Sequence, residues 1–193
     1  MKKRLLFLPM MLLLLAGCGG RQEGEQGAEA LAVAIRGEYL AMTGYSLQAQ
    51  VNADYGQRVY DFTLSVTSDG EETTVTIREP EMLSGVTARI NGEEGVLEYD
   101  GLSLETGFLD GNSLSPVGAL PVLMEAVRSQ YMAGCTLADG MLEVYCADPE
   151  QRPGTGQEVK LWFDAQTHAL TGGEISQDGR RVIDCQITEF TMT

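Results

Sequence analysis

From Tyr45 onward, apolar and polar residues alternate in short runs, which is the period of half-buried β-strands. Every second residue from Tyr45 to Ala53 is apolar, and the alternation resumes from Tyr60 to Val66. Later runs are separated by Asp-Gly or Asn-Gly pairs, which favour the positive φ angles of tight hairpins. The pattern predicts a meander of antiparallel strands with one apolar and one polar side.

Two stretches have helical spacing instead. The apolar positions of the first are Ala28, Leu31, Ile35, Tyr39 and Met42, and its opposite face carries Glu29, Arg36 and Glu38. The second stretch is expected to begin near Pro121, because proline suits the first turn of a helix, and to end at Gly134 as a cap. Its apolar positions are Leu120, Leu123, Met124, Val127 and Tyr131.

The predicted order is one helix, about six strands, a second helix and about five strands. Residues 108–119 and 148–156 are the expected loops on either side of the second helix and its hairpin. This order predicts an α+β fold, with a strongly curved antiparallel sheet of about 11 strands and two helices on its concave side.

The N-terminus has the pattern of a secretory signal. Lys2, Lys3 and Arg4 precede an apolar run that ends in Leu15-Ala16-Gly17-Cys18. This ending resembles the lipobox of bacterial lipoproteins. The resemblance implies removal of residues 1–17, a diacylglycerol on the Cys18 thiol, and a lipid-anchored protein on the extracytoplasmic face of a membrane. An uncleaved anchor fits less well because the run is short for a bilayer.

Residues 18–27 contain glycine, glutamine and charge, which is typical of a flexible tether, and residues 28–193 form the expected domain. All 28 acidic residues follow Cys18 but only 10 of the 13 basic ones do, so the mature charge is −18. A chain this acidic has no basic stripe for phosphates, which argues against a nucleic-acid partner.

Cys135, Cys146 and Cys185 are an odd number of thiols for an exported domain. If Asp139-Gly140 is a two-residue turn, Cys135 faces Val144, and Cys146 is a diagonal neighbour too distant for an easy disulfide. A shift of the turn by one residue would place the two cysteines opposite each other. The first register has the better turn chemistry, so free thiols are expected.

Catalytic chemistry has little support in the sequence. His168 is the only histidine and lies in an expected turn, without a metal-ligand motif around it. The pairs Glu71-Glu72 and Glu93-Glu94 lie beside tight turns, where charged residues are simply exposed. The motifs of hydrolases, metalloproteases and nucleotide-binding proteins do not occur, so no catalytic residue, metal or cofactor is expected.

The predicted layout resembles the LolA/LolB superfamily of lipoprotein carriers, together with LppX and LprG. The local matches are Ile77-Arg78-Glu79-Pro80, Ile90-Asn91-Gly92 and the run from Leu97 to Gly101. The resemblance implies a half-open barrel whose helices cover a hydrophobic cavity for acyl chains. Glu79 interrupts the family's Arg-Pro pair, and Met82-Leu83 replace its aromatic pair, which leaves the cargo open.

The stretch from Ile77 to Gly101 also looks like LolA-like lipoproteins of Gram-positive spore formers, such as the germination lipoprotein GerS. Some of these are partners of cell-wall amidases. Two functions therefore stay open: binding or carriage of a hydrophobic ligand, and a membrane-anchored interaction module that partners an envelope enzyme. The residues that either line a cavity or fill a core are Leu64, Val66, Val75, Ile77, Val86, Ile90, Leu97, Tyr99, Leu104, Leu123 and Val127.

Overall fold

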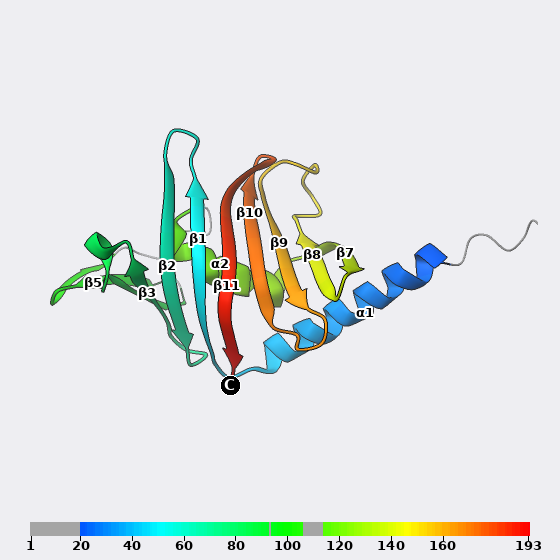
Figure 1. The fold of residues 1–193 in the computed structure, drawn as a ribbon, viewed down its shortest axis with the longest axis horizontal. Helices are drawn as coiled ribbons and strands as arrows, with labels where there is room; N and C mark the ends of the chain where they lie inside the picture. Colours follow the sequence, from blue (N-terminus) through cyan, green and yellow to red (C-terminus); the bar gives the residue numbers. More distant parts are fainter. Residues whose placement is uncertain (1–19, 93, 106–113) are drawn as a thin grey trace, which may run out of the picture.

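The computed structural model of the chain describes residues 20–92, 94–105 and 114–193. It has one antiparallel sheet in the order β6-β5-β4-β3-β2-β1-β11-β10-β9-β8-β7 (Figure 1). The first and last strands of this order do not pair with each other, so the sheet stays open. The predicted α+β fold, with six strands before the second helix and five after it, is confirmed.

The strands before the second helix are β1 (Tyr45–Asp54), β2 (Val59–Ser68), β3 (Thr73–Glu79), β4 (Thr87–Asn91), β5 (Glu94–Tyr99) and β6 (Leu102–Glu105). Those after it are β7 (Met132–Ala138), β8 (Met141–Cys146), β9 (Gln157–Asp164), β10 (Leu170–Gln177) and β11 (Arg180–Met192). The helices are α1 (Gly20–Ala41), α2 (Pro116–Ser129) and the short 3-10 turn η1 (Glu81–Leu83).

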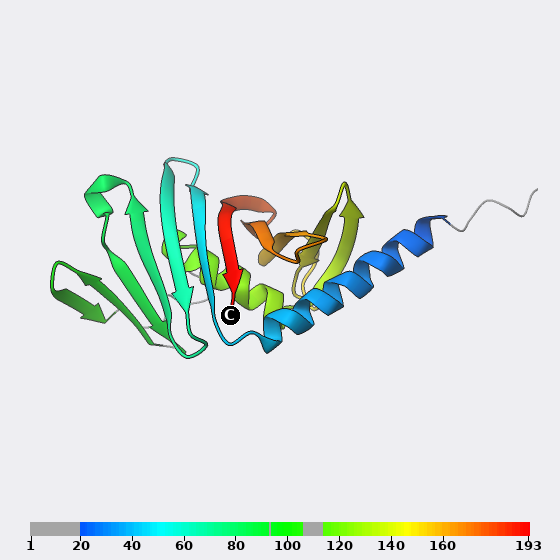
Figure 2. The same ribbon diagram turned by 60° about the horizontal axis from the view of Figure 1, so that its bottom comes forward.

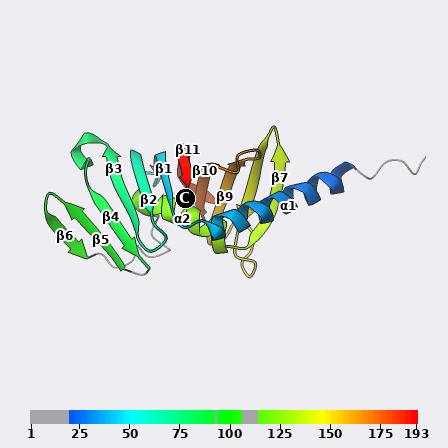
Figure 3. The same cartoon turned by 90° about the horizontal axis from the view of Figure 1, so that it is seen from below.

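Both long helices lie on one side of the sheet (Figures 2 and 3). The α2 helix crosses the middle of the sheet and contacts β1, β11, β9, β10, β2 and β3, whereas α1 packs on β7 and β8. The buried apolar side chains of the strands point toward these helices, and among the described residues no polar or charged residue is buried. The core is therefore a single apolar layer between the helices and the concave face.

Tight turns follow the Asp-Gly pairs, as predicted. In the β7–β8 turn, Asp139 and Gly140 have φ angles of 52° and 78°, and the β5–β6 and β10–β11 turns have the same conformation. Two consecutive positive φ angles match the right-handed twist of the flanking strands. The Asp69-Gly70 turn is wider than these, because the Asp69 carboxylate accepts the N–H groups of Glu71 and Glu72 and so stabilises the loop between Ser68 and Thr73.

The predicted bounds of the second helix are wrong. The helix begins at Pro116, which takes the first-turn position expected for Pro121, and Pro121 lies inside the helix. It ends at Ser129, so Tyr131 is outside it, and Gly134 lies in β7 instead of capping the helix. Pro116 suits a helix start equally well, and the earlier start buries Ala119 and Leu120 against the sheet.

The first helix begins at Gly20 rather than at Ala28, so residues 20–27, expected to be a flexible tether, are helical. Glutamate, glutamine and arginine are good helix formers, and a helix already nucleated by its packed part extends through them at low cost. This N-terminal part of α1 projects beyond the β7 edge of the sheet (Figure 1).

Two predictions concern residues outside those that the structure describes. They are the signal and acylation site at residues 1–18, and the first half of the loop expected at residues 108–119. Of its second half, Pro116–Ala119 belong to α2. Neither helix in the described residues is long and apolar enough to cross a membrane.

Candidate functional site

The concave face of β2–β6 is the part of the molecule where apolar side chains pass from core to surface. One cross-strand row runs Val66, Val75, Ala88, Leu97 and Leu104 from β2 to β6. The first three are buried and Leu97 is half-buried, whereas Leu104 is 64% exposed. The sheet thus extends past its helical cover while it continues to present apolar side chains on the concave side.

The neighbouring positions extend this surface, which we call the apolar face (Leu97, Tyr99, Leu102 and Leu104). Tyr99 pairs with Leu102 across β5 and β6, and their exposed fractions are 50% and 75%. Apolar side chains in contact with water are unfavourable, so an exposed group of this kind is typical of a binding surface. Leu102 was missing from the sequence-based list, although its β6 alternation with Leu104 could have included it.

The other predicted lining residues belong to the buried apolar cluster or pack against it. Leu64, Ile77 and Leu123 are buried, as are Ile90 and Val127, and Val86 is half-buried against the same cluster. Sequence reasoning could not separate these positions from the apolar face, because both consist of aliphatic residues at inward strand positions.

Packing is close where α2 crosses β10. A Cβ atom at Gly173 would lie 2.6 Å from Cδ1 of Leu123, so the helix rests directly on a strand position without a side chain. Beside it, the void between α1, Val127 and strands β8 and β9 is only about 10 Å³. About one water molecule would fill such a space, and an acyl chain would not fit there.

The Tyr39 side chain fixes α1 to the β9–β10 turn. Its hydroxyl donates to the His168 carbonyl over 3.1 Å and accepts the Leu170 N–H over 2.9 Å. The ring packs edge-on against Phe163 and stacks on Phe190, each with centroids 5.6 Å apart. Burial raises the Tyr39 pKa far above its ordinary value, so the hydroxyl stays protonated and keeps both bonds.

His168 itself has a structural role in this turn. Its Nδ1 lies 2.8 Å from Oε1 of Glu38, which adds a second contact between the turn and α1. Among the described residues, no group of three histidine, cysteine, aspartate or glutamate side chains is arranged to hold a metal ion.

The thiols have the register that the turn chemistry predicted. Cys135 pairs with Val144, and Ala138 pairs with Met141, so the register with free thiols is confirmed; the remaining thiol, Cys185, is free as well. Burial raises the pKa of Cys146 to about 11 and raises that of Cys185 further, so both remain protonated thiols at neutral pH.

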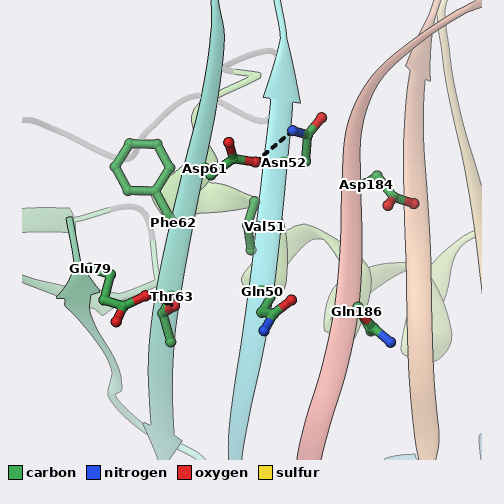
Figure 4. Close-up of a pocket in the computed structure, with 9 residues that line it drawn as sticks. All are labelled: Gln50, Val51, Asn52, Asp61, Phe62, Thr63, Glu79, Asp184 and Gln186. Carbon is green, nitrogen blue, oxygen red and sulfur yellow. Dashed lines mark hydrogen bonds between the residues drawn. The ribbon is translucent and has the colours of Figure 1, made fainter.

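On the convex side, a polar depression of about 300 Å³ lies across β2, β1 and β11 (Figure 4). Asn52 donates to the Asp61 carboxylate over 2.7 Å, and the Thr63 hydroxyl donates to Glu79 over 2.9 Å. Asp61, Glu79 and Asp184 of β11 are the three carboxylates that line the depression. Sequence reasoning missed this depression, since its residues come from strands far apart in the chain.

Comparison with known proteins identifies no family: no family model matches the chain, and no curated protein matches it. Solved structures do match. A LolA superfamily protein from Nitrosomonas europaea has a TM-score of 0.47 and 13% identity, with 86% of this chain and 93% of that chain covered.

The Mycobacterium tuberculosis lipoprotein LppX has a TM-score of 0.44 and 14% identity, covering 84% of this chain and 95% of that one. The Clostridioides difficile CwlD amidase in complex with the GerS lipoprotein also matches, with a TM-score of 0.44, 14% identity, and 86% and 92% of the chains covered. At such scores the likeness is one of arrangement, and no ligand or partner of this chain follows from it.

Proposed function

We propose that this chain is a lipoprotein, anchored through Cys18 to the extracytoplasmic face of a membrane, that binds a lipid or acyl chain on its apolar face. The cross-strand row from Val66 to Leu104 carries the ligand proposal, because it leads from a packed core to exposed apolar positions without a charged side chain. Each CH₂ group of a ligand that leaves water there contributes about 0.8 kcal/mol.

The filled part of the concave face limits where the ligand lies. Leu123 lies directly on Gly173, and the void between α1 and strands β8 and β9 is only about 10 Å³, so neither of these two places has room for an acyl chain. The ligand therefore binds toward the β5–β6 end of the sheet, and its polar group stays in solvent. Charged ligands such as nucleic acid find no complementary group on this uncharged face.

The start of α1 supports the anchor proposal. The helix begins at Gly20, two residues after Cys18, and Ala28 of this helix is buried against the domain. Eight helical residues span about 12 Å at 1.5 Å per residue, so the helix would hold the domain a short distance from the acylated cysteine.

Binding of a dansyl-labelled undecanoic acid to the purified protein tests the ligand proposal, together with native mass spectrometry for co-purified lipid. We expect dansyl fluorescence to rise with the wild-type protein and to fall sharply with Leu104→Asp, which places a charge on the apolar face. Val33→Asp is the matched control, since Val33 is 62% exposed but lies on α1. A wild-type protein that holds no lipid and leaves the probe unbound would overturn the proposal.

The second candidate function is an interaction module that partners an envelope protein without carrying lipid. One observation favours it: four residues of β2, Val59–Phe62, have no strand beside them on the β3 side within the part of the chain that the structure describes. An unpaired strand edge is a template for pairing with another chain.

A further inference from the structure

The β2 strand is longer than its neighbour β3, which leaves an open notch inside the sheet. β2 pairs with β1 along its whole length, from Asp54↔Val59 to Tyr45↔Ser68. Its pairing with β3 stops at Thr63↔Glu79, after which the chain turns away through Pro80 into η1. Proline has no N–H and cannot extend the ladder, so the outer edge of residues 59–62 lacks a strand partner among the described residues.

The side chains on this edge are accessible and differ between the two faces of the sheet. Val59 is 56% exposed and Tyr60 is 39% exposed, Asp61 is exposed, and Phe62 is half-buried. Tyr60 and Phe62 belong to the concave side, where their rings are 6.5 Å apart, and Asp61 belongs to the convex side. An added strand would therefore meet aromatic rings on one face and a carboxylate on the other.

Two depressions border the notch on the convex side. The first is the depression of about 300 Å³ in Figure 4, where the labelled Asp61 and Glu79 lie on either side of the β2 edge. The second, of about 390 Å³, is lined by Asp61, Arg78, Glu79, Pro80, Glu81 and Ser84. The shared residues show that the depressions meet at the free edge, and together they give room for long side chains.

The charge on the convex side of the notch is negative. Asp61 and Glu79 accept hydrogen bonds from neutral groups, and neither has an ion-pair partner among the described residues. Among the described residues, Arg78 is the one cation that lines the depressions, and its Nε donates to the Ser65 hydroxyl over 2.8 Å. The convex side of the notch therefore complements a basic side chain.

We propose that the β2 edge at Val59–Phe62 is a docking site for an extended protein segment that adds a strand there. The segment alternates apolar residues, which pack on Tyr60 and Phe62, with basic residues, which reach Asp61 and Glu79. Main-chain hydrogen bonds hold such a strand and the alternating side chains select it. This inference rests on the second candidate function and specifies its partner chemistry; it does not depend on a lipid ligand.

The test uses two capped eight-residue peptides on the whole mature protein, one alternating lysine and valine and one alternating glutamate and valine. Fluorescence anisotropy measures their binding, and amide hydrogen exchange maps it. We expect the lysine peptide alone to bind and to slow exchange of outward-facing amides within residues 59–62. The double variant Asp61→Asn and Glu79→Gln should weaken binding several-fold.

The matched control neutralises two exposed carboxylates elsewhere, Glu94→Gln with Glu105→Gln, and should bind the lysine peptide as the wild type does. Equal binding of both peptides would overturn the proposal, as would binding without protection at residues 59–62. If the lysine peptide slows amide exchange at another surface instead, the β2 docking site is disproved but the interaction function is not. If neither peptide binds, the result counts against both the docking site at the β2 edge and the proposed interaction function.

Discussion

The Arg36 guanidinium donates through Nε to the Val127 carbonyl over 2.7 Å and so joins α1 to the end of α2. The same guanidinium also donates to the carbonyls of Ala126 and Gln130. The last carbonyls of a helix have no partner within the helix, and a cation there opposes the helix dipole favourably. The Arg36 side chain therefore caps the C-terminal end of α2 and holds α1 against it.

Replacing Arg36 by methionine should lower the free energy of unfolding by about 2–3 kcal/mol, because partly buried carbonyls lose charge-assisted hydrogen bonds. Chemical denaturation at neutral pH measures the change. Arg152→Met is the control, since Arg152 is exposed and its side chain has no hydrogen bond or ion pair with any described residue. Equal midpoints for the two variants would show that the contact contributes little.

The contact made by Arg36 could not be predicted from the sequence. Helical spacing placed Arg36 on the polar face of the first helix, where a charge is normally solvated. Its carbonyl partners lie about ninety residues away, and local periodicity carries no information about such contacts. The strand count, by contrast, came from alternation and Asp-Gly turns, and the pairing of Cys135 with Val144 came from turn chemistry alone.

The site was only partly predictable for a related reason. Val75 and Leu104 are both aliphatic residues at inward positions, yet one is buried and the other is 64% exposed. The difference depends on how far α2 reaches across the sheet, which only the three-dimensional arrangement fixes. The unpaired part of β2 likewise results from the unequal lengths of two strands.

Gly173→Ala tests the contact between α2 and β10. The new Cβ would lie 2.6 Å from Leu123, so the helix must shift, and overpacking of this kind costs about 1–3 kcal/mol. The double variant with Leu123→Val should recover part of the loss, because valine removes the Cδ atoms involved. A double-mutant cycle on unfolding free energies measures this coupling. Additive effects would mean that the two residues do not press on each other.

Alkaline pH should weaken the fold through Cys146. Its pKa is raised by burial from 9.0 to about 11, so between these values the unfolded chain releases a proton that the folded chain keeps. Stability due to this thiol is fully present below pH 9 and is lost as pH rises toward 11. Cys146→Ala should show a shallower decline of the unfolding free energy over this range. Identical slopes for wild type and variant would contradict the assignment.

Cys18→Ala should abolish acylation and release the protein from the membrane, since the lipobox-like motif supplies no other thiol there. Metabolic labelling with an alkyne fatty acid, followed by fractionation, measures both effects. Cys135→Ala is the control and should label as the wild type does. Label that survives in the Cys18 variant would disprove this attachment site.

Two phenylalanine substitutions should differ in their effect on stability, because one lies in the covered part of the concave face and the other in its exposed part. Val127 is buried beside a void of about 10 Å³, so Val127→Phe has no space to occupy and should cost about 1–3 kcal/mol. Leu104→Phe lies at the exposed end of the same face and should leave the melting temperature nearly unchanged. Thermal melts compare the two variants directly. Tolerance of Val127→Phe would mean that α2 yields to make room, and the ligand site would then extend beneath the helix instead of ending at β5 and β6.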